Sequence, residues 1–352
     1  MTTTDRTALE QPAQAPASRF AALSSRIRRP HPADVAAAVA YTLAALFVMQ
    51  GQWKNLANGY LANSAQDQAM WEWFFAVAAH SVAHGENPLW SDLQNFPNGV
   101  NLMANTAMFG LSIPLAPITL LLGPTLTWAI ALTGGLAGTA YAWYWLFSRT
   151  VAASRGASAL GGALCGFAPG MISHANGHPN FVVLFLLPVI AALVIEIARS
   201  GPSARKTVAL GLVAALQFML GAEPLLIFAI AFGIFAVAYY LGSPPRLLPA
   251  LKNAAKSLPA AAALTLILIA FPLYWQFYGP ESYASLEHGP MGNDFNALLQ
   301  FPAQSIGGDL APGESYRINP TEDNSYFGWP LILLTLVAAV PLWRVACARA
   351  AA

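Results

Sequence analysis

The first long polar loop of this chain opens with the residues Asn63-Ser64-Ala65-Gln66-Asp67-Gln68-Ala69-Met70-Trp71-Glu72-Trp73-Phe74-Phe75. Carboxylates and aromatic side chains crowd together here, whereas long apolar runs make up most of the chain. Apolar residues recur at helical spacing over residues 65–84, and one stripe contains Trp71, Phe74, Phe75 and Ala78. We therefore expect a membrane-surface helix over 65–84 that carries Asp67 in its first turn, where the helix dipole favours a carboxylate.

The composition is that of a membrane protein. The chain has 352 residues, of which 56% are hydrophobic and only 9% are charged, whereas a soluble domain carries about 25% charged residues. Several apolar runs approach the roughly 20 residues that a helix needs to cross a bilayer. Cys165 and Cys347 lie in or beside such runs, so we expect no disulfide framework. The expected fold class is an all-α polytopic membrane protein.

The positive charges decide which apolar runs span the membrane. The runs cover 35–50, 104–122, 126–147, 157–172, 180–198, 207–220, 224–241, 258–275 and 328–343. If all of them span, most Lys and Arg residues fall outside, which reverses the positive-inside rule. If 104–122 does not span, only Lys54 and Arg317 remain outside. Pro114 and Pro117 also disfavour a regular helix there. We therefore predict about eight spans, with 104–122 interfacial or re-entrant.

This count places both termini in the cytoplasm and the chain in the plasma membrane. Residues 1–33 are rich in Ala, Ser, Thr, Pro and Arg, so we expect a disordered cytoplasmic tail. The first apolar run follows without a small-residue cleavage site, so we expect an uncleaved first span. Residues 34–349 are expected to form the transmembrane domain, with external loops at about 51–125 and 276–327. Most acidic residues and five of the histidines fall on this outer side.

The first external loop offers several candidate residues. Asp67 is either a catalytic carboxylate or only the N-terminal cap of a helix that lies on the membrane. His80 and His84, four residues apart, are either a metal pair or surface histidines. Asp92 lies in a stretch whose Pro and Gly residues exclude a helix. In that stretch Pro97-Asn98-Gly99 predicts a turn, which either cradles an anion with its amides or joins two surface helices.

Two short turns between spans carry further polar residues. The turn at 173–180 contains His174, Asn176 and His178, which are either metal or phosphate ligands or parts of an interfacial turn. Glu223 lies between two apolar runs with no loop to solvate it. A carboxylate at that depth is costly unless it is paired or faces a polar cavity, so Glu223 is either functional or a helix N-terminal carboxylate that reaches headgroup water.

Cations on the outer face are rare. A lipid-phosphate substrate needs one, and Arg suits phosphate through its bidentate fork. Arg317 is therefore a candidate phosphate ligand together with Lys54; the alternative for Arg317 is a salt bridge to Glu314 or Glu322. No nucleotide-binding, redox or zinc-protease motif is present in the sequence, and we expect no nucleic-acid partner.

Four stretches carry a resemblance to a known family: Asp67 to Trp73, Gly85-Glu86-Asn87-Pro88-Leu89-Trp90, Phe96-Pro97-Asn98-Gly99-Val100-Asn101-Leu102 and Leu122-Gly123-Pro124. With them the chain resembles the GT-C superfamily of integral-membrane glycosyltransferases, which use polyprenyl-phosphate-linked sugars. The four stretches are similar to an uncharacterised bacterial branch of that superfamily. The resemblance extends from about residue 34 to the stretch 324–330.

The resemblance implies that Asp67 is the general base for an acceptor hydroxyl and a contact for a divalent metal, Mg or Mn. The reading of the residues assigns the other candidates. Glu223 is the candidate for a second catalytic carboxylate, and Arg317 or Lys54 would hold the donor phosphate. Asp92, His174, Asn176 and His178 would lie near the substrate or metal. The partners would be a polyprenyl-phosphate-linked sugar, membrane lipids and an extracytoplasmic glycan, lipid or protein acceptor.

Two other classes of function remain open at this stage. A flippase or transporter of lipid-linked sugars would need charged residues within spans and an internal repeat, and the sequence has no evident repeat. A non-catalytic membrane assembly protein would keep the same fold without the activity.

Overall fold

The computed structural model describes residues 31–57, 59–61, 65–104, 107–150, 154–242, 244–282 and 326–345. Nearly all of the predicted cytoplasmic tail, Arg317 and most of the predicted second external loop lie outside these residues. The described chain is mostly helical. Its elements are α2 (Pro32–Val48), α3 (Gln50–Lys54), α4 (Ala65–His84), β1 (Trp90–Ser91), β2 (Val100–Asn101), α5 (Phe109–Ser112), α6 (Ala116–Leu122), α7 (Pro124–Thr150), α8 (Arg155–Phe167), α9 (Pro169–His174), η1 (Pro179–Phe181), α10 (Leu186–Ser200), α11 (Ala204–Leu220), α12 (Ala222–Gly242), α13 (Pro244–Tyr278) and α14 (Trp329–Leu342).

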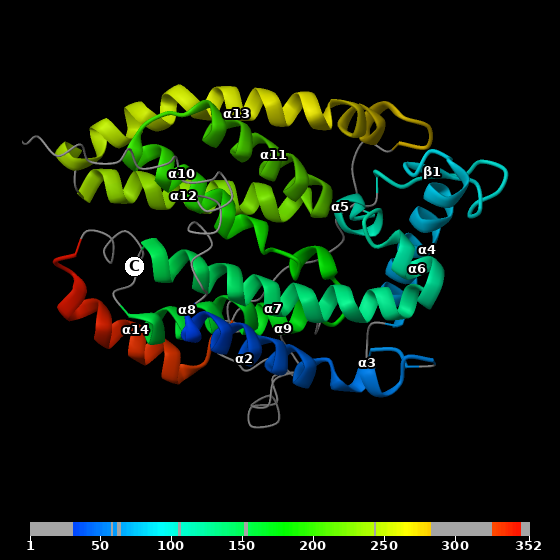
Figure 1. Ribbon diagram of the computed structural model, residues 1–352, viewed down its shortest axis with the longest axis horizontal. Coiled ribbons are helices and arrows are strands. Elements are labelled where there is room, and N and C mark those ends of the chain that lie inside the picture. The colour runs from blue at the N-terminus through cyan, green and yellow to red at the C-terminus, as the bar shows by residue number, and fades with distance from the viewer. Residues whose placement is uncertain are drawn as a thin grey trace, which may run out of the picture.

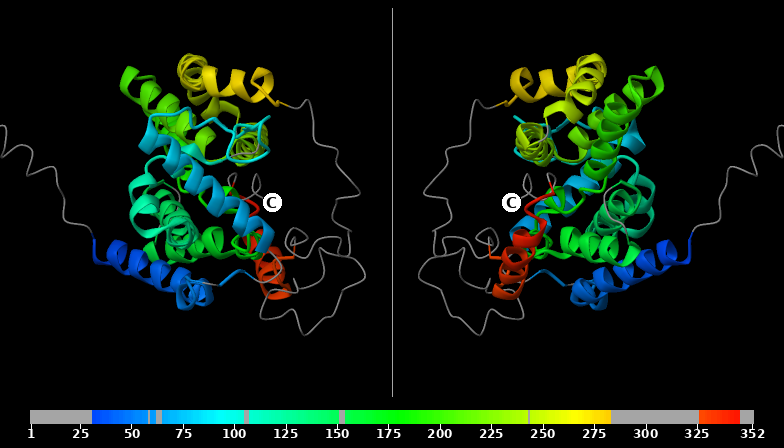
Figure 2. Two further views of the ribbon diagram at one scale, coloured as in Figure 1. Left: turned by 90° about the vertical axis from the view of Figure 1, so that its right-hand side faces the viewer. Right: turned by 90° about the vertical axis from the view of Figure 1, so that its left-hand side faces the viewer.

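The longer helices run side by side along the long axis of the molecule (Figure 1). One layer contains α2, α7 and α8, and the other contains α10, α11, α12 and α13. Contacts of α10 with both α7 and α11 join the two layers. The described residues between α2 and α7 gather at one end, where α4 lies across the ends of the long helices, as Figure 1 and Figure 2 show.

Three helical segments are long and apolar enough to cross a membrane. They are Pro179–Ser200, Ala222–Gly242 and Leu248–Tyr278. The second of these, α12, leaves most of its large apolar side chains exposed, as expected for a helix that faces lipid. Two shorter apolar helices, α2 and α14, fall below the spanning length. The described chain therefore has the character of a membrane protein.

Several expected boundaries need correction. The expected span 157–172 is two helices, because α8 ends at Phe167 and Pro169 begins α9; proline lacks the N–H that would continue the first helix. The helix expected over 258–275 is longer, because α13 begins at Pro244. Its first turns carry Lys252 and Lys256, which a search for apolar runs leaves out. The all-α expectation also misses the short antiparallel pair β1 and β2.

Two other expectations are confirmed. The helix predicted over 65–84 is α4, with the same bounds. The run 104–122 is not one helix, because α5 ends at Ser112 and α6 begins at Ala116. Pro114 lies in the turn between them, consistent with the steric conflict that proline creates inside a helix.

Helix α7 lies at the centre of the described structure. Its 27 residues extend about 40 Å, and it packs against α2, α4, α6, α8 and α10. Trp128, Leu132, Leu136 and Tyr144 are fully buried along it. Its many Thr, Gly, Trp and Tyr residues lower its hydropathy, and it is not among the three candidate spans.

Glycines bring α7 and α8 into close contact. Gly162 and Gly166, one turn apart on α8, both face Ala140 of α7. A Cβ atom at Gly166 would lie 2.4 Å from the Cβ of Ala140, and one at Gly162 would lie 2.6 Å from its carbonyl oxygen. This spacing of small residues lets two helix backbones approach without intervening side chains.

A buried carboxylate ties α2 to both helices at the end of the molecule away from α4. Asp34 accepts a hydrogen bond from the Tyr144 hydroxyl (2.6 Å) and one from Arg149 Nη2 (2.9 Å), and it also pairs with Arg155. The hydroxyl and the two guanidinium groups supply the hydrogen bonds and opposite charge that a carboxylate needs when it is removed from water.

The glycine contact predicts opposite effects for two Gly→Ala substitutions. Gly166→Ala is expected to lower the apparent melting temperature of the detergent-solubilised protein by several degrees, because the new methyl group collides with Ala140. Gly134 lies in the interior of α7, and a Cβ atom there would have no atom within 4 Å. Gly134→Ala should leave the melting temperature unchanged or raise it, because Ala is more favourable than Gly inside a helix by about 1 kcal/mol. Equal behaviour of the two variants would contradict this packing.

Candidate functional site

A buried glutamine fixes the start of α4. Gln68 accepts a hydrogen bond from the Leu61 amide (2.8 Å) and donates to the Gly59 carbonyl (3.1 Å) and to Glu72 Oε1 (2.8 Å). The same Gly59 carbonyl accepts a bond from Gln52 of α3 (3.2 Å). These bonds hold the segment after α3 against the first turn of α4, which contains Asp67.

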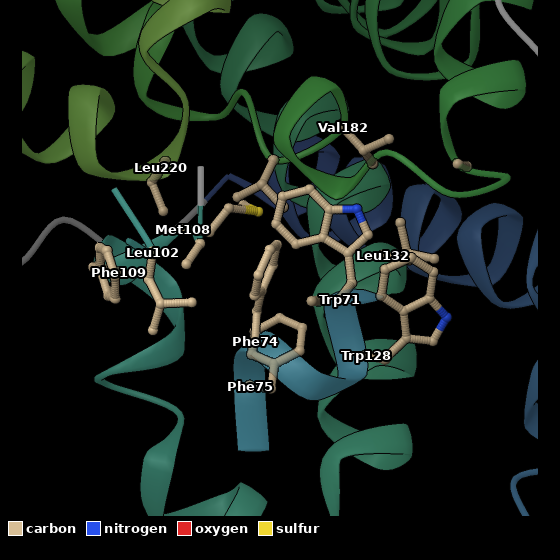
Figure 3. Packing of buried hydrophobic residues seen from close by; sticks show 14 of the residues in the cluster. Trp71, Phe74, Phe75, Leu102, Met108, Phe109, Trp128, Leu132, Val182 and Leu220 are labelled. Atoms are coloured by element: carbon tan, nitrogen blue, oxygen red, sulfur yellow. The ribbon is translucent and has the colours of Figure 1, made fainter. Parts of the chain in front are cut away.

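Asp67 is partly exposed in this first turn. The aromatic stripe that follows it, with Trp71, Phe74 and Phe75, is buried in the main apolar cluster, where it meets Trp128 and Leu132 of α7 (Figure 3). The stripe predicted from the sequence is therefore present. It packs against protein, so the alternative of a helix that rests its aromatic face on the membrane is wrong.

The same cluster reaches the turn at 173–180, which contains His174 and His178 and is called the histidine turn below. Ala175, Val182 and Val183 belong to it together with Trp71, and Figure 3 shows Trp71 beside Val182. Thr139 of α7 donates to the Val182 carbonyl (2.8 Å) and accepts from the Leu184 amide (3.0 Å), which satisfies the irregular backbone before α10.

The two histidine rings of this turn meet edge to face, and both residues are partly buried. The ring centroids of His174 and His178 are 5.8 Å apart, and His174 also contacts the ring of Phe181 at 4.8 Å. His174 Nδ1 lies 2.7 Å from the Gly170 carbonyl oxygen. Asn176, between the two histidines, is partly buried.

Glu223 is next to this turn in space. It lies exposed in the first turn of α12. A Cβ atom added to the preceding Gly221 would lie 3.2 Å from the Asn180 carbonyl oxygen, so the turns at 173–180 and 221–223 touch. The structure thus brings together the backbones of two turns that carry predicted candidates and are far apart in sequence.

The stretch around Asp92 forms a small hairpin. Trp90 pairs with Asn101 and Ser91 with Val100, and the loop between them has a turn at 96–98, which overlaps the predicted turn Pro97-Asn98-Gly99. Gly99 has φ +74°, and a Cβ atom there would lie 2.2 Å from the Trp90 ring. Only glycine fits this position, because it tolerates positive φ and leaves room for the indole.

This hairpin docks on the end of α13. The Asn101 side-chain amide donates to the Trp275 carbonyl (2.9 Å), and Trp275 Nε1 donates to the Leu89 carbonyl (3.1 Å). Asn101 Oδ1 also accepts from the Met103 amide (3.1 Å). The hairpin is therefore held by α13 on one side and connected to α4 on the other.

A cavity of about 350 Å³ lies between the hairpin and α4. It is lined by Trp73, Phe74, Gln94, Asn95, Gly99, Val100, Asn101, Leu102 and Glu281. Its polar groups are amides and one carboxylate, beside the aromatic ring of Trp73. This volume is within the range of ligand sites, and mixed aromatic and polar linings are typical of them.

None of the predicted site residues that the structure describes lines this cavity. Asp67 is seven residues before Phe74, so it lies about 10 Å away along the same face of α4. Asp92 is exposed on the hairpin loop, and the Lys54 ammonium donates to Gln50 Oε1 (2.9 Å) on α3. Arg317 lies outside the described residues.

The cavity residues Gln94, Asn95, Asn101 and Glu281 were not among the candidates from the sequence. The signal available was the concentration of Asn and Gln in a loop rich in Pro and Gly. That signal does not identify α13 as the docking partner, because Asn101 and Trp275 are 174 positions apart in the sequence.

Within the described ranges, no three His, Cys, Asp or Glu side chains are close enough together to hold a metal ion. Asp67, Glu223 and the histidine turn therefore do not form a ready metal site there. His80 and His84 stack at 4.1 Å, and His80 Nε2 lies 3.7 Å from Glu86 Oε2. We assign no chemical step to a metal.

Comparisons of the chain with protein-family models, with curated proteins and with solved structures found no match.

The docking bonds predict that Asn101 keeps the hairpin ordered. Asn101→Ala removes the donor to Trp275 and the acceptor for the Met103 amide, at a cost of roughly 1–3 kcal/mol. Hydrogen–deuterium exchange over residues 89–104 should become faster in this variant. Asn98→Ala, an exposed position in the same loop, is the matched control and should exchange like the wild type. Equal protection in all three proteins would exclude the proposed docking role.

Proposed function

We propose that the protein is a GT-C membrane glycosyltransferase, which moves a sugar from a polyprenyl-phosphate donor to an extracytoplasmic glycolipid, polysaccharide or protein. The observation that carries the proposal is the arrangement along α4. This helix lies across one end of the long helices, with the carboxylate of Asp67 in its first turn and the cavity beside Trp73 and Phe74 two turns further on. A carboxylate, an amide-lined cavity and adjacent lipid are what such a transfer requires.

The proposed reaction is a single displacement at the anomeric carbon. Asp67 accepts the proton of the acceptor hydroxyl while the hydroxyl oxygen forms the new bond to that carbon. The bond between the carbon and the phosphate oxygen breaks, and the electron pair leaves with polyprenyl phosphate. Because attack and departure occur on opposite faces, the sugar configuration inverts. The negative charge that develops on the phosphate requires a cation, and Arg317 and Lys54 are the proposed sources.

The cavity is the proposed site for a sugar ring. The aromatic face of Trp73 offers an apolar surface to the C–H groups of a pyranose, and amide side chains bind hydroxyl groups as both donors and acceptors. The amides of Gln94 and Asn95 and the carboxylate of Glu281 supply these bonds. The distance of about 10 Å from the cavity to Asp67 along α4 places the reacting centre at one end of an extended substrate.

The proposed topology has eight passes, formed by α2, α7, α8 with α9, α10, α11, α12, α13 and α14, with both termini in the cytoplasm. In support, α2, α7, α10, α11, α12 and α13 lie along the long axis of the molecule (Figure 1), and the short helices of the first loop gather at one end. Under this proposal the plasma membrane surrounds the long helices, and the end that carries α4 faces outward.

Glu223 and the histidine turn complete the proposal. The turns that hold them touch each other, and the histidine turn shares its apolar cluster with Trp71, one turn from Asp67. We assign Glu223 to orient the acceptor or donor, together with His174, Asn176 and His178. Asp92 lies in the hairpin loop, directly after β1 and two residues before the cavity residue Gln94.

Substitution of Asp67 tests the catalytic assignment. Asp67→Asn and Asp67→Ala are expected to reduce sugar transfer from polyprenyl-phosphate donors by a factor on the order of 10²–10⁴, the usual contribution of a general base. Glu86→Gln, in the same loop but outside the proposed site, should retain activity. Full activity in both Asp67 variants at normal expression would remove Asp67 from the mechanism.

A glycolipid profile of a deletion strain separates two classes of function. If the protein is a transferase, the strain contains an acceptor without its sugar; if it is a flippase, the strain accumulates the intact precursor.

Substitution of Gln94 tests the cavity. Because Gln94 is proposed to bind hydroxyl groups away from the reacting centre, Gln94→Ala should raise KM for the sugar substrate several-fold, with a smaller change in kcat. The matched control is Leu93→Ala, the exposed neighbour that does not line the cavity. A loss of kcat at unchanged KM would contradict a binding role.

A further inference from the structure

A second cavity, of about 540 Å³, lies between the start of α11 and α13. It is at the other end of the molecule from the proposed transfer site, because α5 of the first loop packs against Leu216 and Leu220 near the end of α11. Its lining consists of Pro202, Ser203, Ala204, Thr207, Val208, Lys256, Ser257, Ala260 and Leu264. The polar and the apolar members of this set occupy different parts of the cavity.

The start of α11 offers free backbone amides to the cavity. The first N–H groups of a helix have no partner within the helix, and the helix dipole adds partial positive charge there. Ser203 occupies the N-cap position of this 17-residue helix, but its side chain makes no capping hydrogen bond. These amides are available to an anion.

Ser257 supplies independent evidence for a ligand. Its side chain is almost completely buried, it lines the cavity, and its hydroxyl has no hydrogen-bond partner among the described residues. A buried hydroxyl without a partner costs free energy, and a bound phosphate oxygen would accept its hydrogen bond.

The cavity also has an unmatched positive charge. Lys256 lines it and forms no ion pair within the part of the chain that the structure describes, whereas the ammonium of the nearby Lys206 pairs with Glu196 at 2.9 Å. Lys256 therefore adds a full charge to the partial charge of the helix end.

The remaining lining makes the site suitable for a lipid. Helices α11 and α13 run in the same direction, because Gly211 contacts Ala261 and Leu264 while residues 203–207 and 256–257 share the cavity. Val208 and Leu264 consequently lie one or two turns further along the helices than the polar groups. A ligand that matches this order has an anionic head and an apolar tail.

We propose that this cavity binds an anionic phospholipid, with its phosphate at the α11 N-terminus, Lys256 and Ser257, and an acyl chain along Val208 and Leu264. Basic pockets between membrane helices on the cytoplasmic side recognise such headgroups. The inference rests on the proposed topology, which places this end of α11 and α13 on the cytoplasmic side, but it is independent of sugar transfer.

The test is a titration of the detergent-solubilised full chain with phosphatidylglycerol, phosphatidylcholine or inorganic phosphate, read as the shift of its melting temperature. Phosphatidylglycerol should stabilise the wild type most strongly. Lys256→Gln should weaken that effect roughly fivefold in lipid concentration, as expected for the loss of one cation beside an anionic lipid. Lys252→Gln, one turn earlier on α13 and outside the cavity, should titrate like the wild type.

Ser257→Ala gives a second measurement that does not depend on charge. It removes the unpaired hydroxyl, so the lipid-free protein should keep or gain thermal stability while its response to phosphatidylglycerol weakens. The proposal would be overturned by equal effects of phosphatidylglycerol and phosphatidylcholine, or by Lys256→Gln and Ser257→Ala titrations that match the wild type. Stabilisation by inorganic phosphate with no effect of the lipid would overturn the assignment to a phospholipid.

Discussion

The described structure depends on a series of hydrogen bonds made by the polar side chains of α7. Thr127 bonds to Thr119 of α6 (2.9 Å), Thr133 accepts from the indole of Trp53 in α3 (2.9 Å), and Thr139 holds the backbone at Val182. Near the end of the helix Tyr144 donates to Asp34 of α2. Three of these bonds are buried and the bond to Trp53 is partly buried, so an unpaired partner would be costly. One helix thus fixes the position of α6, which directly precedes it, and of three segments that are distant in sequence.

The contacts of α7 and α13 also hold the candidate site in place. Helix α4 is packed against α7 through Trp71 and Phe75, and its first turn is tied to the segment after α3 through Gln68 and the Gly59 carbonyl. On the other side, Trp275 of α13 holds the hairpin that closes the cavity. A loop of this length would otherwise lose considerable conformational entropy whenever it bound a substrate. Anchoring at both ends means that this cost is met during folding.

The sequence was informative where the signal was local. The period of the apolar residues identifies α4, and Pro114 identifies the break between α5 and α6, because both follow from backbone geometry. The docking of Asn101 on Trp275 was not predictable, since neither residue differs in type from many other Asn and Trp residues of the chain. Ser257 is a similar case: serine is common in helices, and only its burial without a partner singles it out. Sequence reasoning therefore identifies elements, while contacts between distant elements require the fold.

Helix α7 also shows why hydropathy finds three candidate spans although eight passes are proposed. High hydropathy is required of a helix whose side chains face lipid, and α12, whose large apolar side chains are mostly exposed, has it. A helix surrounded by other helices does not need an apolar surface on all sides. Its glycines allow close approach, and its threonines and tyrosines are acceptable because neighbours satisfy them. The helix that organises the bundle is then expected to be less apolar than the helices that face lipid, and α7, at about 40 Å, is long enough to cross the hydrocarbon core.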